Sequence, residues 1–156
     1  MASRRGAAYS AVVTQTTGSS AAFDQLSPEQ VEAFTDRFIS AWNSHDPSQL
    51  VALSNPDVMW DDDIIEGGRL VGHQALIEWL SAIWWTVPDL TFEIVGNPRL
   101  ALDRRSATVN WRGTGTMTGE RQSPGSAPTN GPVEWFGSDT HWMRKGKLAH
   151  VLTVND

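Results

Sequence analysis

The chain has 156 residues, 40% of them hydrophobic, and a formal net charge of −6. This size and composition indicate one folded domain, and the acidic balance argues against a nucleic-acid partner or an anionic membrane surface. The absence of Cys excludes disulfides and thiolate chemistry. No apolar run approaches the roughly 18 residues of a membrane span, and residues 7–20 are too polar for the core of a signal peptide. We therefore expect a soluble, cytoplasmic protein.

The N-terminal part predicts a tail followed by helices. Residues 1–25 are rich in Ala, Ser, Thr and Gly and show no period, so we expect a disordered tail and a domain over residues 26–156. Ser27 and Pro28 are typical of a helix start, and apolar residues then recur at helical spacing to about Ser44. Two further helices are expected, a short one stopped at Asn55-Pro56 and a longer one over residues 71–87.

The rest of the chain changes to the period of strands. After a short strand near residues 58–64, strands are expected over residues 90–95, 100–102, 106–117, 133–143 and 148–154. Residues 118–132 contain Pro, Gly, Ser and Asn and have the length of a lid loop. Helices first and antiparallel strands later predict an α+β fold, in which a curved antiparallel sheet wraps around the N-terminal helices and forms a cone-shaped pocket.

Three consecutive carboxylates follow Trp60 in the first strand. Because a strand alternates its faces, Asp62 shares the apolar side with Val58 and Trp60, whereas Asp61 and Asp63 point the other way. A carboxylate on an apolar face is either paired or used in chemistry. We therefore take Asp62 as a candidate catalytic group, and we expect Asp61 and Asp63 to be solvated.

The aromatic content is the second feature with functional meaning. Eight Trp occur in the chain, and Trp60, Trp111 and Trp135 fall on inward strand faces. A Trp-rich wall suits a flat or bulky apolar substrate such as a polyketide or a terpenoid. Ordinary core packing is the alternative for each of these residues.

The residues resemble those of the SnoaL-like polyketide cyclases, a family of the nuclear-transport-factor-2-like superfamily. The resemblance covers nearly all of residues 31–156, in family order and spacing, and is weak for any single segment. Its matching segments are Ala41 to Asp46, Pro56 to Trp60, Val71 to Leu76, Pro88 to Glu93, Trp111 to Gly119, and Gly146 to the terminal Asp156.

The resemblance implies a conical pocket, a homodimer formed through the sheet and a small-molecule substrate. Ketosteroid isomerase is similar at greater distance, and its catalytic base corresponds to Asp62. A second pocket carboxyl of these enzymes corresponds to Asp139, which shares a strand face with His141. The isomerase's oxyanion tyrosine corresponds to Phe38, and a histidine common in the cyclases corresponds to Met117; neither residue present here donates a hydrogen bond.

We therefore expect a cofactor-independent cyclase or isomerase (lyase or isomerase class) of secondary metabolism, such as antibiotic biosynthesis. Asp62 would be the base, Asp139 the partner acid, and His141 a proton shuttle or a group that tunes this acid. Substrate-binding candidates are Trp60, Phe38, Trp111, Met117 and Trp135. No His or Asp spacing typical of a metal site is present, so no metal is expected.

Two alternatives remain open. The same two carboxyls would suit acid-catalysed epoxide opening, although Arg112 is expected on the outward face and so leaves no inward arginine for an Asp-Arg-Asp set. The other alternative is a non-catalytic ligand-binding or dimerisation module.

Overall fold

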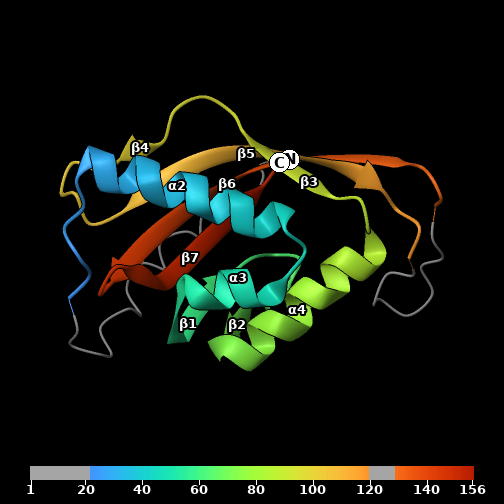
Figure 1. Ribbon diagram of the computed structural model, residues 1–156, viewed down its shortest axis with the longest axis horizontal. Helices are drawn as coiled ribbons and strands as arrows, with labels where there is room; N and C mark the ends of the chain where they lie inside the picture. Colours follow the sequence, from blue (N-terminus) through green and yellow to red (C-terminus); the bar gives the residue numbers. More distant parts are fainter. Residues whose placement is uncertain (1–21, 120–128) are drawn as a thin grey trace, which may run out of the picture.

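A computed structural model describes residues 22–119 and 129–156, and in these residues three helices lie against one face of a curved sheet (Figure 1). The helices are α2 (Pro28–Asn43), α3 (Pro47–Ala52) and α4 (Gly72–Thr86). The strands are β1 (Ser54–Asp61), β2 (Arg69–Val71), β3 (Thr91–Ile94), β4 (Arg99–Leu100), β5 (Ala107–Thr116), β6 (Pro132–Arg144) and β7 (Lys147–Asn155), and a short 3-10 helix, η1 (Glu66–Gly68), precedes β2. The predicted α+β class and curved sheet are confirmed.

Helix α2 begins as its sequence predicts. The Ser27 hydroxyl accepts from the backbone N–H of Gln30 at 3.1 Å, and the Gln30 side chain accepts from the backbone N–H of Ser27 at 2.8 Å. This reciprocal capping box fixes where the helix starts. Its buried stripe, which includes Phe34 and Phe38, then faces the sheet.

The sheet has the strand order β2-β1-β7-β6-β5-β3, and β4 pairs with β5. All neighbours are antiparallel except β1 and β7, which run parallel. The parallel pair and strand β2 differ from the predicted run of antiparallel strands. The parallel register sets Trp60 beside Val151 and Asp61 beside Leu152, so the end of β1 lies next to the C-terminal part of the chain.

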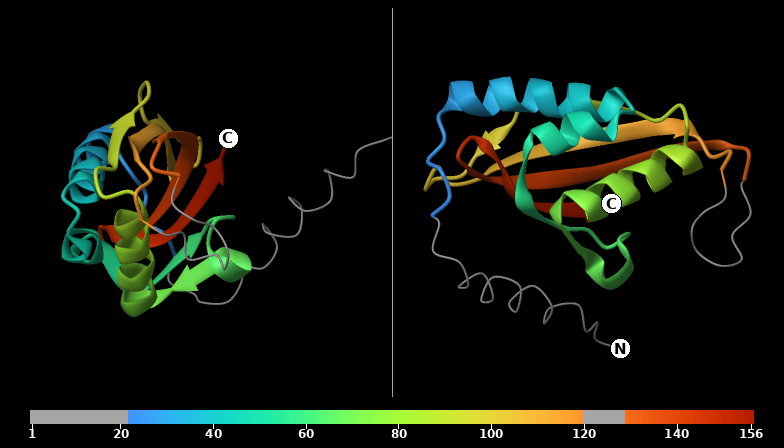
Figure 2. Two further views of the ribbon diagram at one scale, coloured as in Figure 1. Left: turned by 90° about the vertical axis from the view of Figure 1, so that its right-hand side faces the viewer. Right: turned by 60° about the horizontal axis from the view of Figure 1, so that its bottom comes forward.

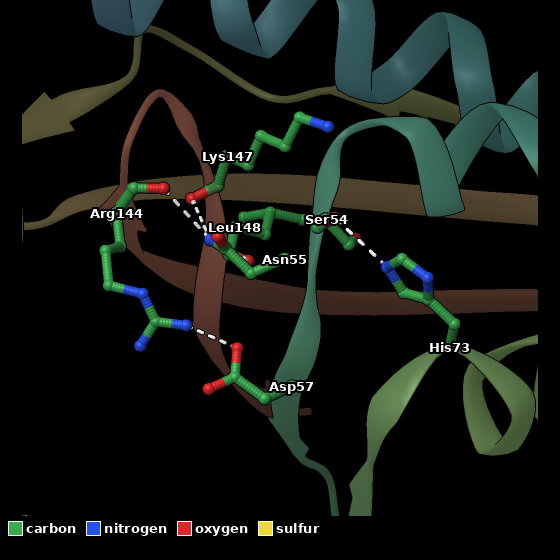
Figure 3. Close-up of polar contacts among 7 residues, drawn as sticks. All are labelled: Ser54, Asn55, Asp57, His73, Arg144, Lys147 and Leu148. Atoms are coloured by element: carbon green, nitrogen blue, oxygen red, sulfur yellow. Dashed lines mark hydrogen bonds and ion pairs between the residues drawn. The ribbon is translucent and has the colours of Figure 1, made fainter. Parts of the chain in front are cut away.

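Strand β1 starts earlier than predicted, because Asn55 is not a helix stop but a strand residue that ties β1 to the β6–β7 turn. Its side-chain amide donates to the carbonyls of Arg144, Lys147 and Leu148 at 3.0, 3.1 and 3.0 Å (Figure 3). Nearby, the imidazole of His73 contacts the carbonyl oxygen of Ser54 at 3.1 Å. These contacts anchor the start of β1 both to the turn and to the first turn of α4.

The two faces of the sheet differ. The helices cover the concave face, whereas the other face carries no helix from the described residues (Figures 1 and 2). Alternation along β6 directs Trp135, Asp139 and His141 to the covered face, and Asp139 and His141 are buried there. Within residues 22–119 and 129–156, none of the helices combines the length and the hydropathy that a transmembrane span requires.

Two predicted segments fall partly or wholly outside the described residues. Residues 1–21 of the expected tail and residues 120–128 of the expected lid loop are not described. The tail prediction extends too far at its C-terminal end, because the carboxylate of Asp24 accepts hydrogen bonds from the backbone of Lys145 and Gly146 at 3.0 and 2.8 Å. Residues 22–25 thus belong to the packed part of the chain.

Candidate active site

A cavity of about 570 Å³ lies between the helices and the concave face of the sheet. It is lined by Phe38, Ile39, Trp42, Asp62, Asp63, Ile64, Trp79, Ala82, Ile83, Thr86, Phe92, Ile94, Trp111, Met117, Trp135, Phe136, Asp139, Thr153, Asn155 and Asp156. The walls are mainly aromatic and aliphatic, and both predicted catalytic carboxyls belong to the lining. Such an apolar cavity with a few convergent polar groups is typical of a small-molecule site.

Asp62 lies directly after β1 and is 5% exposed. Its Oδ1 accepts from the backbone N–H of Ile64 at 3.0 Å and from the side chain of Asn155 at 2.8 Å. Burial raises the pKa of Asp62 to about 6, against the lowering effect of these two donors, and the neighbouring Asp63 carboxylate adds to the rise. A carboxyl of this kind is ionised near neutral pH and remains a stronger base than an exposed aspartate.

Asp139 lies in the middle of β6 and is 4% exposed. Its Oδ1 accepts from the indole N–H of Trp111 at 3.0 Å and from the hydroxyl of Thr153 at 2.8 Å. Burial raises the pKa of Asp139 to about 7; the donors from Trp111 and Thr153 lower it, and the charge of Asp62 raises it further.

The hydrogen bond from Trp111 to Asp139 depends on a glycine, Gly137, in β6. Trp111 and Gly137 are direct partners across β5 and β6, and a Cβ at Gly137 would collide with the indole ring of Trp111. Glycine therefore leaves room for the ring to lie across β6, two residues from Asp139, where its N–H reaches the carboxyl.

The two carboxyls share one arrangement. In each, Oδ1 is held by two donors, and no N–H or O–H of the described residues donates to Oδ2. The structure thus places two buried acids on one cavity, each with its Oδ1 held by two donors. Burial raises both pKa values well above that of an exposed aspartate, to about 6 for Asp62 and about 7 for Asp139.

His141 does not lie on this cavity, although the sequence analysis assigned it to the catalytic set. It is 2% exposed, packs against the rings of Phe34 and Phe38, and borders a separate hollow of about 180 Å³. Its Nε2 lies 4.0 Å from Asp139 Oδ2, which is too long for a hydrogen bond. Burial lowers the pKa of His141 to about 3, so the ring is neutral at physiological pH.

Trp60 is also absent from the lining, contrary to its predicted contact with substrate. Its ring is 1% exposed and packs between Phe38 and Trp79, with centroids 6.2 and 5.2 Å away. Its indole N–H donates to Thr153 Oγ1 at 2.9 Å. Trp60 thus packs behind residues of the cavity wall. The other four predicted substrate-binding residues line the cavity: Phe38, Trp111, Met117 and Trp135.

Asp61 corrects a further expectation, because it is buried and paired rather than solvated. Arg69 from β2 donates to both of its oxygens, one at 2.8 Å, and the imidazole of His150 lies 2.8 Å from Oδ2. Burial by itself would raise the pKa of Asp61, but Arg69 and His150 outweigh burial and hold it below its ordinary value. Asp63 is exposed at the cavity rim.

Arg112 lies outside the cavity, as predicted, where it pairs with Glu93 and Glu134. The described lining therefore contains no arginine. No group of three or more Asp, Glu or His side chains in the described part of the chain is arranged to hold a metal ion.

Sequence reasoning missed Thr153 and Asn155, which hold the two carboxyls. Alternation along β7 does place polar Thr153 on the buried face between Val151 and Asn155, and this was the available signal. The partner of each residue depends on the register between β7 and its two neighbours, which the sequence pattern leaves open.

Three helices packed on one face of this curved sheet form the nuclear-transport-factor-2-like fold. The family model for the SnoaL-like domain matches residues 35–151, and the chain therefore belongs to the SnoaL-like family. The sequence has no significant match among curated proteins.

Solved structures show the same fold at low identity. AclR from Streptomyces galilaeus, provisionally described as a hydroxylase, has a TM-score of 0.69 and 19% identity over 83% of this chain and 77% of its own. A protein provisionally described as a SnoaL-like polyketide cyclase from Jannaschia sp. CCS1 has a TM-score of 0.70 and 14% identity over 85% and 91%. SalBIII is an epoxide hydrolase/cyclase-like enzyme with a role in pyran ring formation in the polyether salinomycin. It has a TM-score of 0.66 and 15% identity over 82% of this chain and 92% of its own.

Proposed function

We propose that the protein is a cofactor-independent cyclase or isomerase that acts by acid–base catalysis on a bulky, apolar polyketide or terpenoid-like molecule. The observation that carries this proposal is the pair of buried carboxyls, Asp62 and Asp139, on one aromatic cavity. Membership of the SnoaL-like family supports it, and the small-molecule dimensions of the cavity agree with it.

The roles follow from the two protonation states. Ionised Asp62 takes a proton from a carbon next to a substrate carbonyl, and protonated Asp139 donates a hydrogen bond to the oxygen that becomes an enolate. Returning the proton to another carbon completes an isomerisation. Alternatively, the enolate carbon attacks a second carbonyl of the same molecule, whose oxygen then takes the proton, and this closes a ring. Because Phe38 and Met117 offer no N–H or O–H, Asp139 is the donor for this oxygen.

The two pKa values predict the pH dependence of this activity. Activity requires Asp62 without its proton and Asp139 with its proton, and the respective pKa values are about 6 and about 7. We expect kcat/KM to rise with pH as Asp62 ionises and to fall as Asp139 loses its proton, so that the optimum lies between these values. A pH profile of kcat/KM that keeps rising to pH 9 would contradict the acid role of Asp139.

The test compares Asp62→Asn and Asp139→Asn with the unchanged protein on a panel of polyketide-like ketones and terpenoid ketones, without any cofactor. Each substitution keeps the size of the side chain and removes the acid, so turnover should fall by about 10²-fold or more. Asp103→Asn, at an exposed turn, is the matched control. Unchanged turnover in both active-site variants would overturn the mechanism, and binding without any turnover would favour a ligand-binding module.

Epoxide opening is the second candidate, because a protonated Asp139 would also activate an epoxide oxygen while Asp62 activates the attacking hydroxyl or water. The fold shared with SalBIII is compatible with this chemistry. Apolar epoxides that carry an internal hydroxyl, added to the panel in water enriched in oxygen-18, distinguish these reactions. Labelled diol indicates hydrolysis, an unlabelled ring indicates cyclisation, and conversion of ketones alone indicates the first candidate.

A further inference from the structure

A hydrogen-bond chain reaches Asp139 from the two neighbouring strands β7 and β1. The indole N–H of Trp60 in β1 donates to Thr153 Oγ1 in β7 at 2.9 Å, and Thr153 Oγ1 donates to Asp139 Oδ1 in β6 at 2.8 Å. All three side chains are buried. Three neighbouring strands thus each contribute one member to a chain that ends at the proposed acid.

The chemistry of the first member sets the direction of the chain. An indole N–H can only donate, so Thr153 Oγ1 must accept from Trp60. The single hydroxyl hydrogen of Thr153 is then free to point to Asp139 Oδ1, the nearest acceptor. Trp111 donates to the same oxygen at 3.0 Å, and a proton on Oδ1 would oppose both donors. The proton of the neutral acid therefore belongs on Oδ2.

We propose that Trp60 and Thr153 are positioning residues for Asp139, which through this chain keep its acid proton on Oδ2, the oxygen to which no N–H or O–H of the described residues donates. The inference rests on the proposed acid role of Asp139. It assigns a purpose to a tryptophan that does not line the cavity and to a threonine that the sequence analysis did not identify.

The other ionisable groups near Asp139 cannot replace this chain. His141 is neutral, and its Nε2 is 4.0 Å from Oδ2. Asp62 acts in the opposite sense, because its negative charge raises the pKa of Asp139. Asp63 and Asp156 line the same cavity and also carry negative charge. Within the described residues, stabilisation of the Asp139 carboxylate therefore comes from the neutral donors of Trp111 and Thr153.

The experiment follows the proton on Asp139 without any substrate. The indole N–H of Trp111 donates to this carboxyl, so its nitrogen-15 and proton resonances should move as Asp139 titrates between pH 5 and pH 9. Trp111→Phe identifies this signal among the eight Trp of the chain. In the unchanged protein, the midpoint is expected near the pKa of Asp139, about 7.

Three variants then test the chain. Thr153→Val removes the donor and keeps the shape of the side chain, so the midpoint should rise by about one pH unit. Trp60→Phe removes the N–H that fixes the hydroxyl, together with part of a buried ring, and it should raise the midpoint by a smaller amount. Thr153→Ser restores the donor and should return the midpoint to that of the unchanged protein. Thr108→Val is the matched control, because Thr108 bonds to Thr140 on the other face of the sheet.

The double variant Trp60→Phe/Thr153→Val covers the case in which Thr153→Val unfolds because it leaves the Trp60 N–H without a partner. Removal of both groups avoids that penalty, and the midpoint should again rise. Unchanged midpoints in Thr153→Val and in the double variant would overturn the inference, as would an Asp139 that does not titrate in this range. Because no turnover is measured, failure of the proposed function appears separately, as unaffected catalysis in Asp62→Asn.

Discussion

At the scale of single residues, two buried carboxyls, Asp61 and Asp139, have pKa values shifted in opposite directions. Asp61 is buried against Arg69 and His150, which hold its pKa below the ordinary value against the effect of burial. Asp139 is buried without a cation, and its pKa is raised to about 7. The negative charge of Asp61 is balanced by neighbouring cationic groups, whereas ionisation of Asp139 places an unbalanced charge in the interior and costs free energy.

This contrast predicts opposite effects of two isosteric substitutions on stability. The pKa of Asp139 is higher in the folded than in the unfolded chain, so its favourable contribution is present at low pH and is lost as the pH rises through about 7. Asp139→Asn should therefore raise the free energy of unfolding at pH 8, by a few kcal/mol as an order of magnitude, and by less at pH 5. The amide oxygen can still accept from Trp111 and Thr153.

Asp61→Asn is the internal comparison, because the contribution of Asp61 is present at neutral pH and is lost only as the pH falls below its ordinary titration range. This variant should be destabilised at pH 8. Thermal unfolding at pH 5 and pH 8 measures both effects. A loss of stability in Asp139→Asn of equal size at both pH values would contradict the account of a buried, uncompensated carboxyl.

At the scale of elements, alternation within one strand predicted which side chains face the cavity, but the sequence did not predict which strands pair with each other. The period of two selected Asp62 and agreed with Asp139, and the structure places both on the cavity. The same rule wrongly predicted Asp61 to be solvated. Alternation shows on which face of the strand a side chain lies, but it does not show whether another element packs over that face. The cover comes from Arg69 on β2, a strand of only three residues that no sequence period reveals.

The β1–β7 pairing explains the remaining omissions. Thr153 and Asn155 reach their carboxyl partners only because β7 runs parallel to β1 and antiparallel to β6. Their partners are 14 and 93 positions away in the chain, so local spacing carries no information about them. The helices were easier to predict, because start signals such as the N-cap Ser27 and the first helical residue Pro28 act within a few residues.

The anchor of β1 gives a prediction at this scale. Asn55 is buried and donates to three carbonyls around the β6–β7 turn (Figure 3). Asn55→Ala should lower the free energy of unfolding by about 1–3 kcal/mol, because these carbonyls lose their donor. Asn55→Asp should cost more, since a carboxylate would face three acceptors. Urea unfolding measures both, and an Asp variant as stable as the Ala variant would contradict this role of the amide.

At the scale of the whole molecule, the sheet face opposite the helices is a candidate for self-association. Family resemblance led us to expect a homodimer through the sheet, and the outer face carries Val154, which is 40% exposed. We predict a dimer in light scattering after size-exclusion chromatography, and a shift toward monomer in Val154→Glu, since a charge there would be buried on assembly. Leu102→Glu, in the turn after β4, should leave the mass unchanged. A monomeric unchanged protein would contradict this expectation.

The charge of the cavity extends the same reasoning to ligands. Asp62, Asp63, Asp139 and Asp156 line it, and no Lys, Arg or His of the described residues does. A bound anion would meet this negative field inside walls of low dielectric constant, where repulsion is strong. The aromatic rings, by contrast, favour apolar ligands and tolerate a cation over their faces.

We therefore expect discrimination among ligands that differ only in charge. Naphthylmethanol, naphthylmethylamine and naphthoate share one apolar body, and Trp fluorescence follows their binding. At low salt and pH 7.5, naphthoate should bind at least about tenfold more weakly than the alcohol, and the amine at least as tightly. Added salt and Asp63→Asn should both reduce the difference, because Asp63 is at the exposed rim. Equal binding of naphthoate and the alcohol would show that these carboxyls do not set the ligand charge, and the preference for uncharged polyketide or terpenoid-like substrates would then rest on the aromatic walls alone.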